Sequence, residues 1–249
     1  MLNKLPFKKL KLAKTHDFCA SGEPKLTVVM LHGISSSSKT YDSALKYLEG
    51  TTSLKDIRFV TFDLLGSGES PKSDKLKYNF EEQLEALNNS IDALKVDGPI
   101  VLVGHSMGCL ISIRYADLHR RKVRELILLS PPIYRPEDFE NPIFAMGMDN
   151  FRAVVIQKNP DMKTDKAFNN EMKYIICNPH NYAYYERLTK RTTIIFGLED
   201  QIIASFNIPK LLKANSLITA IETPGTHGVS HDKYSKMIDV LERILNETV

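Results

Sequence analysis

The pentapeptide Gly-His-Ser-Met-Gly at residues 104–108 has the Gly-x-Ser-x-Gly pattern of a serine nucleophile. An apolar strand pattern precedes it and a helical pattern follows it, which is the setting that a nucleophile elbow needs. The sharp turn leaves no room for side chains near the serine, so glycine is favoured on both sides. The helix N-terminus also favours negative charge that develops there. These features predict that Ser106 attacks a carbonyl carbon.

A serine hydroxyl is a weak nucleophile without a base, and the seven histidines of the chain are the candidates. His105 lies inside the pentapeptide, where its side chain is expected to point away from the serine oxygen. His227 and His231 both precede the last helical pattern and remain as alternatives. Three others match no catalytic motif and are expected to be surface or packing residues: His16, His119 and His180.

Short apolar runs alternate with amphipathic helical patterns along the chain. Asn79 is a plausible N-cap for the first of these helices. Strands that alternate with helices predict a mainly parallel, doubly wound sheet. The expected strands are residues 26–31, 57–62, 99–103, 123–129, 192–196 and 217–221, and the expected helices are residues 80–94, 107–118 and 234–245.

Residues 131–190 break this alternation with irregular patterning and many aromatic side chains. A loop of this length is unusual unless it is functional. We expect a small, mostly helical insertion above the sheet, either a peripheral subdomain or a lid that shapes the substrate pocket. Residues 1–130 and 191–249 would then form the two parts of the core.

Four separated motifs make the chain resemble α/β-hydrolases, in their serine carboxylesterase-like branch, over nearly its whole length. The family's order of motifs is much more specific than any one of them. The motifs are His32-Gly33 after an early strand, Asp63 followed by Gly-Ser-Gly-Glu-Ser at 66–70, the elbow, and Gly197-x-x-Asp200 followed by Gly225-Thr226-His227.

The resemblance implies roles for the residues around Ser106. The family's base corresponds to His227, although many members have glycine where Thr226 stands. Glu199 and Asp200 compete for the acid, and the Gly-x-x-Asp pattern favours Asp200. This acid would accept the Nδ1–H bond of the histidine and stabilise the imidazolium.

The required order of the triad along the chain is Ser, acid, His. Asp63 precedes the serine and is therefore expected to be a structural turn residue. The loop after His32 resembles the family's oxyanion loop, which implies that the backbone N–H groups of Ile34 and Met107 stabilise an oxyanion. His32 itself is expected to shape that loop. No metal or organic cofactor is implied.

Composition excludes several other classes of protein. Of the 249 residues, 43% are hydrophobic and 25% charged, as in an ordinary soluble globular protein. The formal net charge of +3 is too small to imply nucleic-acid binding. Residues 9–12 alternate charged and apolar side chains as an exposed strand does, which argues against a membrane-surface segment. No run approaches the roughly 18 apolar residues of a membrane span.

Cysteine usage indicates the compartment. The three cysteines give an odd count without metal-like spacing, which predicts free thiols in a reducing environment. The lysine-rich start also lacks the apolar stretch of a signal peptide. We therefore expect a cytoplasmic enzyme without stable membrane insertion.

The expected activity is hydrolysis of carboxylic esters of small to medium, apolar substrates through an acyl-enzyme intermediate. Thioesters, amides or carbon–carbon bonds are alternatives, because this fold uses one triad for all of these reactions. A serine nucleophile argues against the dehalogenase and epoxide hydrolase branches, which use aspartate. A ligand-binding protein without catalysis is the alternative from another class. Nucleotide binding is disfavoured, since neither glycine-rich phosphate motif occurs at a strand–helix turn.

Overall fold

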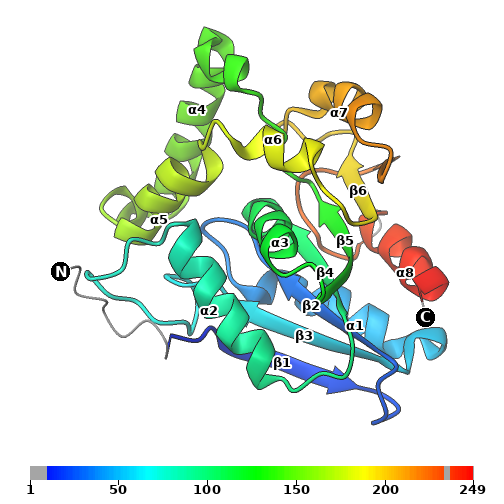
Figure 1. Ribbon diagram of the computed structural model, residues 1–249. Coiled ribbons are helices and arrows are strands. Elements are labelled where there is room, and N and C mark those ends of the chain that lie inside the picture. The colour runs from blue at the N-terminus through cyan, green and yellow to red at the C-terminus, as the bar shows by residue number, and fades with distance from the viewer. Residues whose placement is uncertain (1–9, 233–235, 249) are drawn as a thin grey trace.

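The computed structural model describes residues 10–232 and 236–248, and its centre is one sheet of seven strands (Figure 1). The strand order is β1-β3-β2-β4-β5-β6-β7. β1 runs antiparallel to β3, and all other neighbours are parallel, which confirms the mainly parallel sheet. The strands are β1 (Ala13–Cys19), β2 (Leu26–Leu31), β3 (Ile57–Asp63), β4 (Ile100–His105), β5 (Val123–Leu129), β6 (Thr192–Gly197) and β7 (Ile218–Thr223).

Helices cover both faces of the sheet because its central strands, β2 to β6, are largely apolar on both faces. Successive strand residues point to opposite sides. The helices that flank the sheet are α1 (Asp42–Gly50), α2 (Phe80–Ala93), α3 (Met107–Leu118), α7 (Ile208–Ala214) and α8 (Met237–Thr248) (Figure 1). Val28 and Met30 of β2 belong to the core cluster that includes α1 and α8, whereas Val29 and Leu31 belong to the cluster that includes α2 and α3.

Several expected boundaries agree with the structure. The strand at 123–129 and the helix at 107–118 coincide with β5 and α3. Asn79 caps α2, since its side chain accepts the backbone N–H of Glu82 at 3.1 Å. The helix expected at 234–245 is α8, which runs from Met237 to Thr248. Residues 234 and 235 lie outside the described residues.

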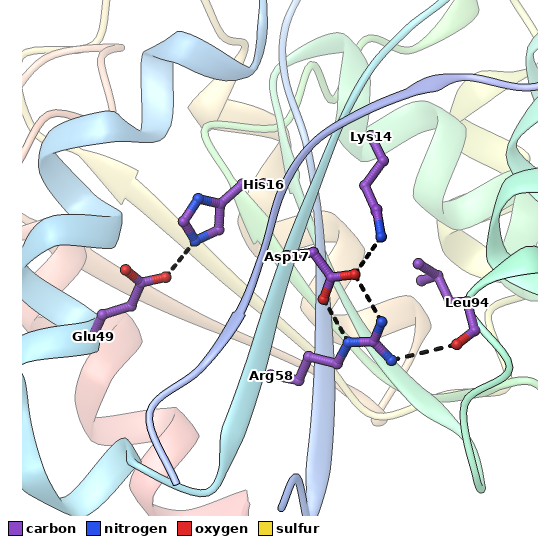
Figure 2. A network of polar contacts seen from close by, with 6 residues as sticks. All are labelled: Lys14, His16, Asp17, Glu49, Arg58 and Leu94. Atoms are coloured by element: carbon purple, nitrogen blue, oxygen red, sulfur yellow. Dashed lines mark hydrogen bonds and ion pairs between the residues drawn. The ribbon is translucent and has the colours of Figure 1, made fainter. Parts of the chain in front are cut away.

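The strand expected at residues 9–12 is shifted. Residue 9 lies outside the described residues, and residues 10–12 precede β1, which begins at Ala13. His16 of β1 contacts Glu49 of α1, with 2.5 Å between Nε2 and Oε1 (Figure 2).

A second set of polar contacts fastens this edge strand to the rest of the sheet (Figure 2). Asp17 accepts hydrogen bonds from Arg58 of β3 at 2.7 and 2.8 Å and also binds Lys14. The same guanidinium donates to the carbonyl of Leu94 after α2, at 3.4 Å. Arg58 holds the pKa of the Asp17 carboxyl at about 2. Strand β1 is therefore bound directly to β3 and, through Arg58, to the residue that follows α2.

The chain between β5 and β6 is helical and lies over one end of the sheet (Figure 1). Its last helix is fastened to the core by Arg114 of α3, whose guanidinium lies 4.5 Å from the ring of Phe80 and 3.7 Å from that of Tyr184. Arg187 stacks on the same Tyr184 ring at 3.6 Å. The larger elements of the insertion are α4 (Pro142–Lys158), α5 (Lys166–Glu171), a π-helical turn (Met172–Ile176) and α6 (Asn181–Glu186).

Candidate active site

Ser106 occupies a strained turn between β4 and α3. Its backbone has φ of 51° and ψ of −118°, in the left-handed half of the map. Such strain costs about 1–3 kcal/mol and concentrates at functional sites. A Cβ on Gly104 would lie 2.6 Å from the Cys109 nitrogen, and one on Gly108 would lie 2.2 Å from the Leu31 carbonyl oxygen. The two glycines of the pentapeptide are therefore required by close backbone packing.

His227 and Asp200 form a pair that meets the geometry of a base and its orienting acid. His227 Nδ1 lies 2.8 Å from Asp200 Oδ2, and the Asp200 side chain is fully buried. Asp200 Oδ1 accepts the backbone N–H of Ile202 at 2.9 Å. Burial raises the pKa of Asp200, but the contacts with His227 and Ile202 outweigh it and lower that pKa. The ionised carboxylate then holds the proton on Nδ1 and leaves Nε2 as the basic nitrogen.

The two alternatives from the sequence lie in other contacts. Glu199 Oε2 accepts the backbone N–H of Gly225 at 2.6 Å and so supports the loop that carries His227. His231 stacks on Tyr47, with ring centroids 3.8 Å apart, and its Nε2 lies 3.1 Å from Asp239 Oδ1. Neither side chain replaces a member of the Asp200 and His227 pair.

Ser106 and His227 line one small cavity together with Ile34. Among the described residues, no hydrogen bond joins the serine oxygen to the imidazole. Such contacts are often long without substrate and tighten only in the reactive complex. The cavity volume is about 10 Å³, which is the space of one water molecule. Its other walls come from the insertion and from the loop after β6: Pro132, Tyr134, Met148, Phe151, Ile176, Ile202 and Ile203.

Two backbone N–H groups near Ser106 are free to bind an anion. Met107 is the first residue of α3, where N–H groups have no partner inside the helix. Within residues 10–232 and 236–248, neither Met107 N–H nor Ile34 N–H donates to an acceptor of the protein. Ser35, directly after Ile34, has φ of 55°. The predicted oxyanion donors thus belong to two sharply turned segments.

Asp63, the last residue of β3, holds the loop that carries Ile34 through hydrogen bonds. Asp63 Oδ1 accepts the backbone N–H of Ser38, and its Oδ2 accepts that of Glu69, both at 2.8 Å. Burial raises the pKa of Asp63, but these N–H donors outweigh it and lower that pKa. The contacts agree with the structural role predicted for Asp63.

His32 supports the same loop from inside. Its Nε2 accepts the backbone N–H of Leu64 at 2.9 Å, so Nδ1 carries the proton and donates to the Gly33 carbonyl at 2.7 Å. Burial lowers the pKa of His32, which keeps the ring neutral. His32 therefore shapes the loop, as expected.

Cys109, three residues after Ser106, is not a competing nucleophile. Its thiol is buried and donates to the carbonyl oxygens of Gly104 at 3.1 Å and Leu129 at 3.4 Å. Burial raises the pKa of this thiol well above its usual value. The reactive thiolate is therefore disfavoured.

Sequence patterns missed two sets of residues at this site. Met148 and Phe151 of α4 line the cavity, but α4 shows no clear helical period of apolar residues. His105 contacts the backbone of His227, a pairing across 122 positions that no local pattern indicates.

Among the helices described, none is long and apolar enough to cross a membrane.

Comparison with known proteins agrees with this geometry. A sequence profile of the alpha/beta hydrolase fold matches residues 27–172. A stretch of 126 residues is 33% identical to the Arabidopsis thaliana protein named Probable lysophospholipase BODYGUARD 5, covering 50% of this chain and 28% of that protein. A stretch of 141 residues is 31% identical to Lipase 1 of Psychrobacter immobilis, covering 57% of this chain and 41% of that lipase. The matched stretches thus span less than half of either relative.

Solved structures show the same fold over almost all of the chain. The monoacylglycerol lipase of Paleococcus ferrophilus superposes with a TM-score of 0.64 at 20% identity, covering 96% of this chain and 98% of that lipase. The family profile covers more than half of the 249 residues, and the mostly parallel sheet has the family's architecture. The chain belongs to the alpha/beta hydrolase fold family.

Proposed function

We propose that this protein is a serine hydrolase that cleaves carboxylic esters. Ser106 attacks the ester carbonyl while His227 takes its proton, and Asp200 stabilises the imidazolium that forms. The backbone N–H groups of Ile34 and Met107 bind the oxyanion, and each such donor contributes roughly 3–4 kcal/mol. His227 then protonates the leaving alcohol. Water, activated by the same histidine, releases the acyl group.

One observation carries this proposal. The serine with a strained backbone and the histidine bound to a buried carboxylate line the same cavity. Strain at Ser106 and burial of Asp200 both cost stability, and a catalytic role accounts for keeping them together. A binding protein without catalysis does not need the pair of His227 and Asp200 beside a strained serine.

We propose that the acyl group of the substrate is apolar. The cavity walls beyond the triad are mostly apolar, with Met148, Phe151 and Ile176 from the insertion. The relatives whose printed names are a lysophospholipase and a lipase support an ester with a fatty acyl chain. A cavity of about 10 Å³ does not hold such a chain, whereas ligand pockets measure roughly 300–1,000 Å³. We therefore propose that α4 shifts when substrate enters.

The test is turnover of nitrophenyl acetate, butyrate and octanoate, with matched thioesters and amides. Wild-type protein is expected to hydrolyse the esters fastest, and Ser106→Ala is expected to abolish this activity. Ser53→Ala, at an exposed serine, is the control and is expected to keep it. Faster turnover of thioesters or amides would reassign the substrate class. Activity of Ser106→Ala near that of wild type would remove the proposal.

A further inference from the structure

The side chain of His105 lies between the two loops that flank Ser106. Its Nε2 is 2.8 Å from the backbone carbonyl oxygen of His227, and the two imidazole rings pack with centroids 5.0 Å apart. A Cβ built on Gly33 would lie 3.3 Å from His105 Nδ1, so the ring lies close beside the loop that carries Ile34. One side chain therefore contacts the loop of the base and lies next to the loop of an oxyanion donor.

The hydrogen bond assigns the tautomer of this ring. A carbonyl oxygen only accepts, so Nε2 of His105 carries the proton and donates it to the His227 carbonyl. Burial, followed by repulsion from His227, lowers the pKa of His105 to about 3. The hydrogen bond to the His227 carbonyl and the charge of Asp200 both raise this pKa, but burial, together with His227 and His32, outweighs them. At neutral pH the ring is uncharged and does not compete with His227 for the carboxylate.

Stability alone does not explain a histidine at this position. The Nδ1 atom of His105 is a buried acceptor without a hydrogen-bond partner in the described part of the chain. An unsatisfied buried acceptor costs free energy, and native proteins keep few of them. A leucine of similar size would remove that cost, but it would also remove the donor to His227.

Gly225 and the side chain of His227 make their hydrogen bonds with residues that directly follow β6. Gly225 exchanges two hydrogen bonds with Glu199, at 2.6 and 3.0 Å, and His227 Nδ1 meets Asp200 at 2.8 Å. A Cβ on Gly197 would lie 2.2 Å from the Gly225 carbonyl oxygen, so this loop packs directly on the end of β6. The bond from His105 instead ties the loop to the elbow that holds Ser106.

We propose that His105 is a positioning residue, whose Nε2–H holds the backbone of His227 so that the imidazole faces Ser106; this role rests on the proposed function of the site. Without this hydrogen bond from His105 (the tether), His227 still contacts Asp200, but its imidazole is no longer held at a fixed distance from Ser106. A misplacement of about 1 Å in a catalytic group can cost about 10²-fold in rate. Proton transfer from Ser106 suffers, whereas binding in the apolar cavity does not.

The experiment compares three variants. His105→Leu removes the donor, His105→Gln keeps an N–H donor of similar reach, and His119→Leu repeats the first change at the far end of α3 as a control. Each is measured for kcat and KM on nitrophenyl butyrate, for the rate of labelling by a fluorophosphonate, for Tm, and for amide hydrogen exchange of residues 225–228. If His105→Leu does not fold, His105→Asn replaces it, because its shorter amide does not reach the carbonyl.

His105→Leu is expected to lower kcat and the labelling rate by about 10- to 100-fold, with KM within about threefold. Residues 225–228 should exchange faster, Tm should not fall, and His105→Gln should recover most of kcat. A folded His105→Leu with kcat within twofold of wild type overturns the proposal, as does unchanged exchange of residues 225–228. If wild type neither turns over esters nor labels, the proposed function fails, and the exchange rates alone decide whether the tether exists.

Discussion

Replacement of Asp200 by asparagine tests how the acid sets the tautomer of the base. Asp200 Oδ1 lies 2.9 Å from the Ile202 nitrogen and 3.4 Å from that of Ile203, both of which are donors. The amide oxygen of asparagine is expected to stay at this position. Its NH₂ group then faces His227 Nδ1, where a carboxylate oxygen now lies at 2.8 Å. Nδ1 becomes an acceptor, and the ring proton moves to Nε2.

The expected loss of activity follows from the move of the His227 proton to Nε2. With Nε2 protonated, His227 has no lone pair for the proton of Ser106. The corresponding change in a serine protease triad lowers kcat about 10⁴-fold. This factor corresponds to about 5.4 kcal/mol of activation free energy. We expect a fall of about 10³- to 10⁴-fold in kcat, with KM little changed because the apolar walls of the cavity stay intact.

The assay is the initial rate of nitrophenyl butyrate hydrolysis, with circular dichroism to show that each variant folds. Asp239→Asn is the matched control, since Asp239 lies 3.1 Å from the Nε2 of His231 outside the candidate site. It is expected to keep kcat within about twofold, and His231→Ala is expected to retain most activity. A folded Asp200→Asn that keeps more than a tenth of wild-type kcat would refute the reasoning.

Three further perturbations follow. Phe151→Ala enlarges the cavity under α4 and should raise kcat/KM for octanoate relative to acetate by about tenfold; an unchanged ratio contradicts the acyl assignment. Gly108→Ala places a Cβ 2.2 Å from a Leu31 oxygen and should destabilise by about 1–3 kcal/mol in thermal unfolding, unlike Gly147→Ala, whose Cβ meets no atom within 4 Å. Asp17 has its pKa lowered from 3.8 to about 2, so it stabilises the fold above pH 3.8 and loses this effect as pH falls through 2. In urea unfolding, Asp17→Asn should be less stable than wild type at pH 7, and the difference should disappear as pH falls below 2; an equal difference at all pH values contradicts the assignment.

Sequence patterns predicted the sheet well because parallel strands buried on both faces are continuous apolar runs. Strands β2 to β6 are largely of this form, whereas the edge strand β7 is mostly half-buried or exposed. The positions of β2 to β7 were all expected to within about two residues. The edge strand β1 was misplaced because its residues are mostly exposed and polar. It pairs with β3 through backbone hydrogen bonds and through the contact of Asp17 with Arg58, which joins residues 41 positions apart.

The candidate site was predicted as far as local motifs extend. Ser106 and the glycines around it lie in one short segment, and the choice of Asp200 over Glu199 came from family spacing. Packing between distant segments brings His105 into contact with His227 and places Phe151 in the wall of the cavity. Tertiary contacts of this kind have no local signature, and the sequence therefore left the cavity undetermined.

Covalent trapping tests the central claim most directly. The folded protein is treated with a fluorophosphonate, digested, and analysed by mass spectrometry to locate the modified residue. A stoichiometric adduct on Ser106, absent when His227 is replaced by alanine, is the predicted result. An adduct on another residue, or a folded protein that forms no adduct, would contradict the assignment of Ser106 as an activated nucleophile.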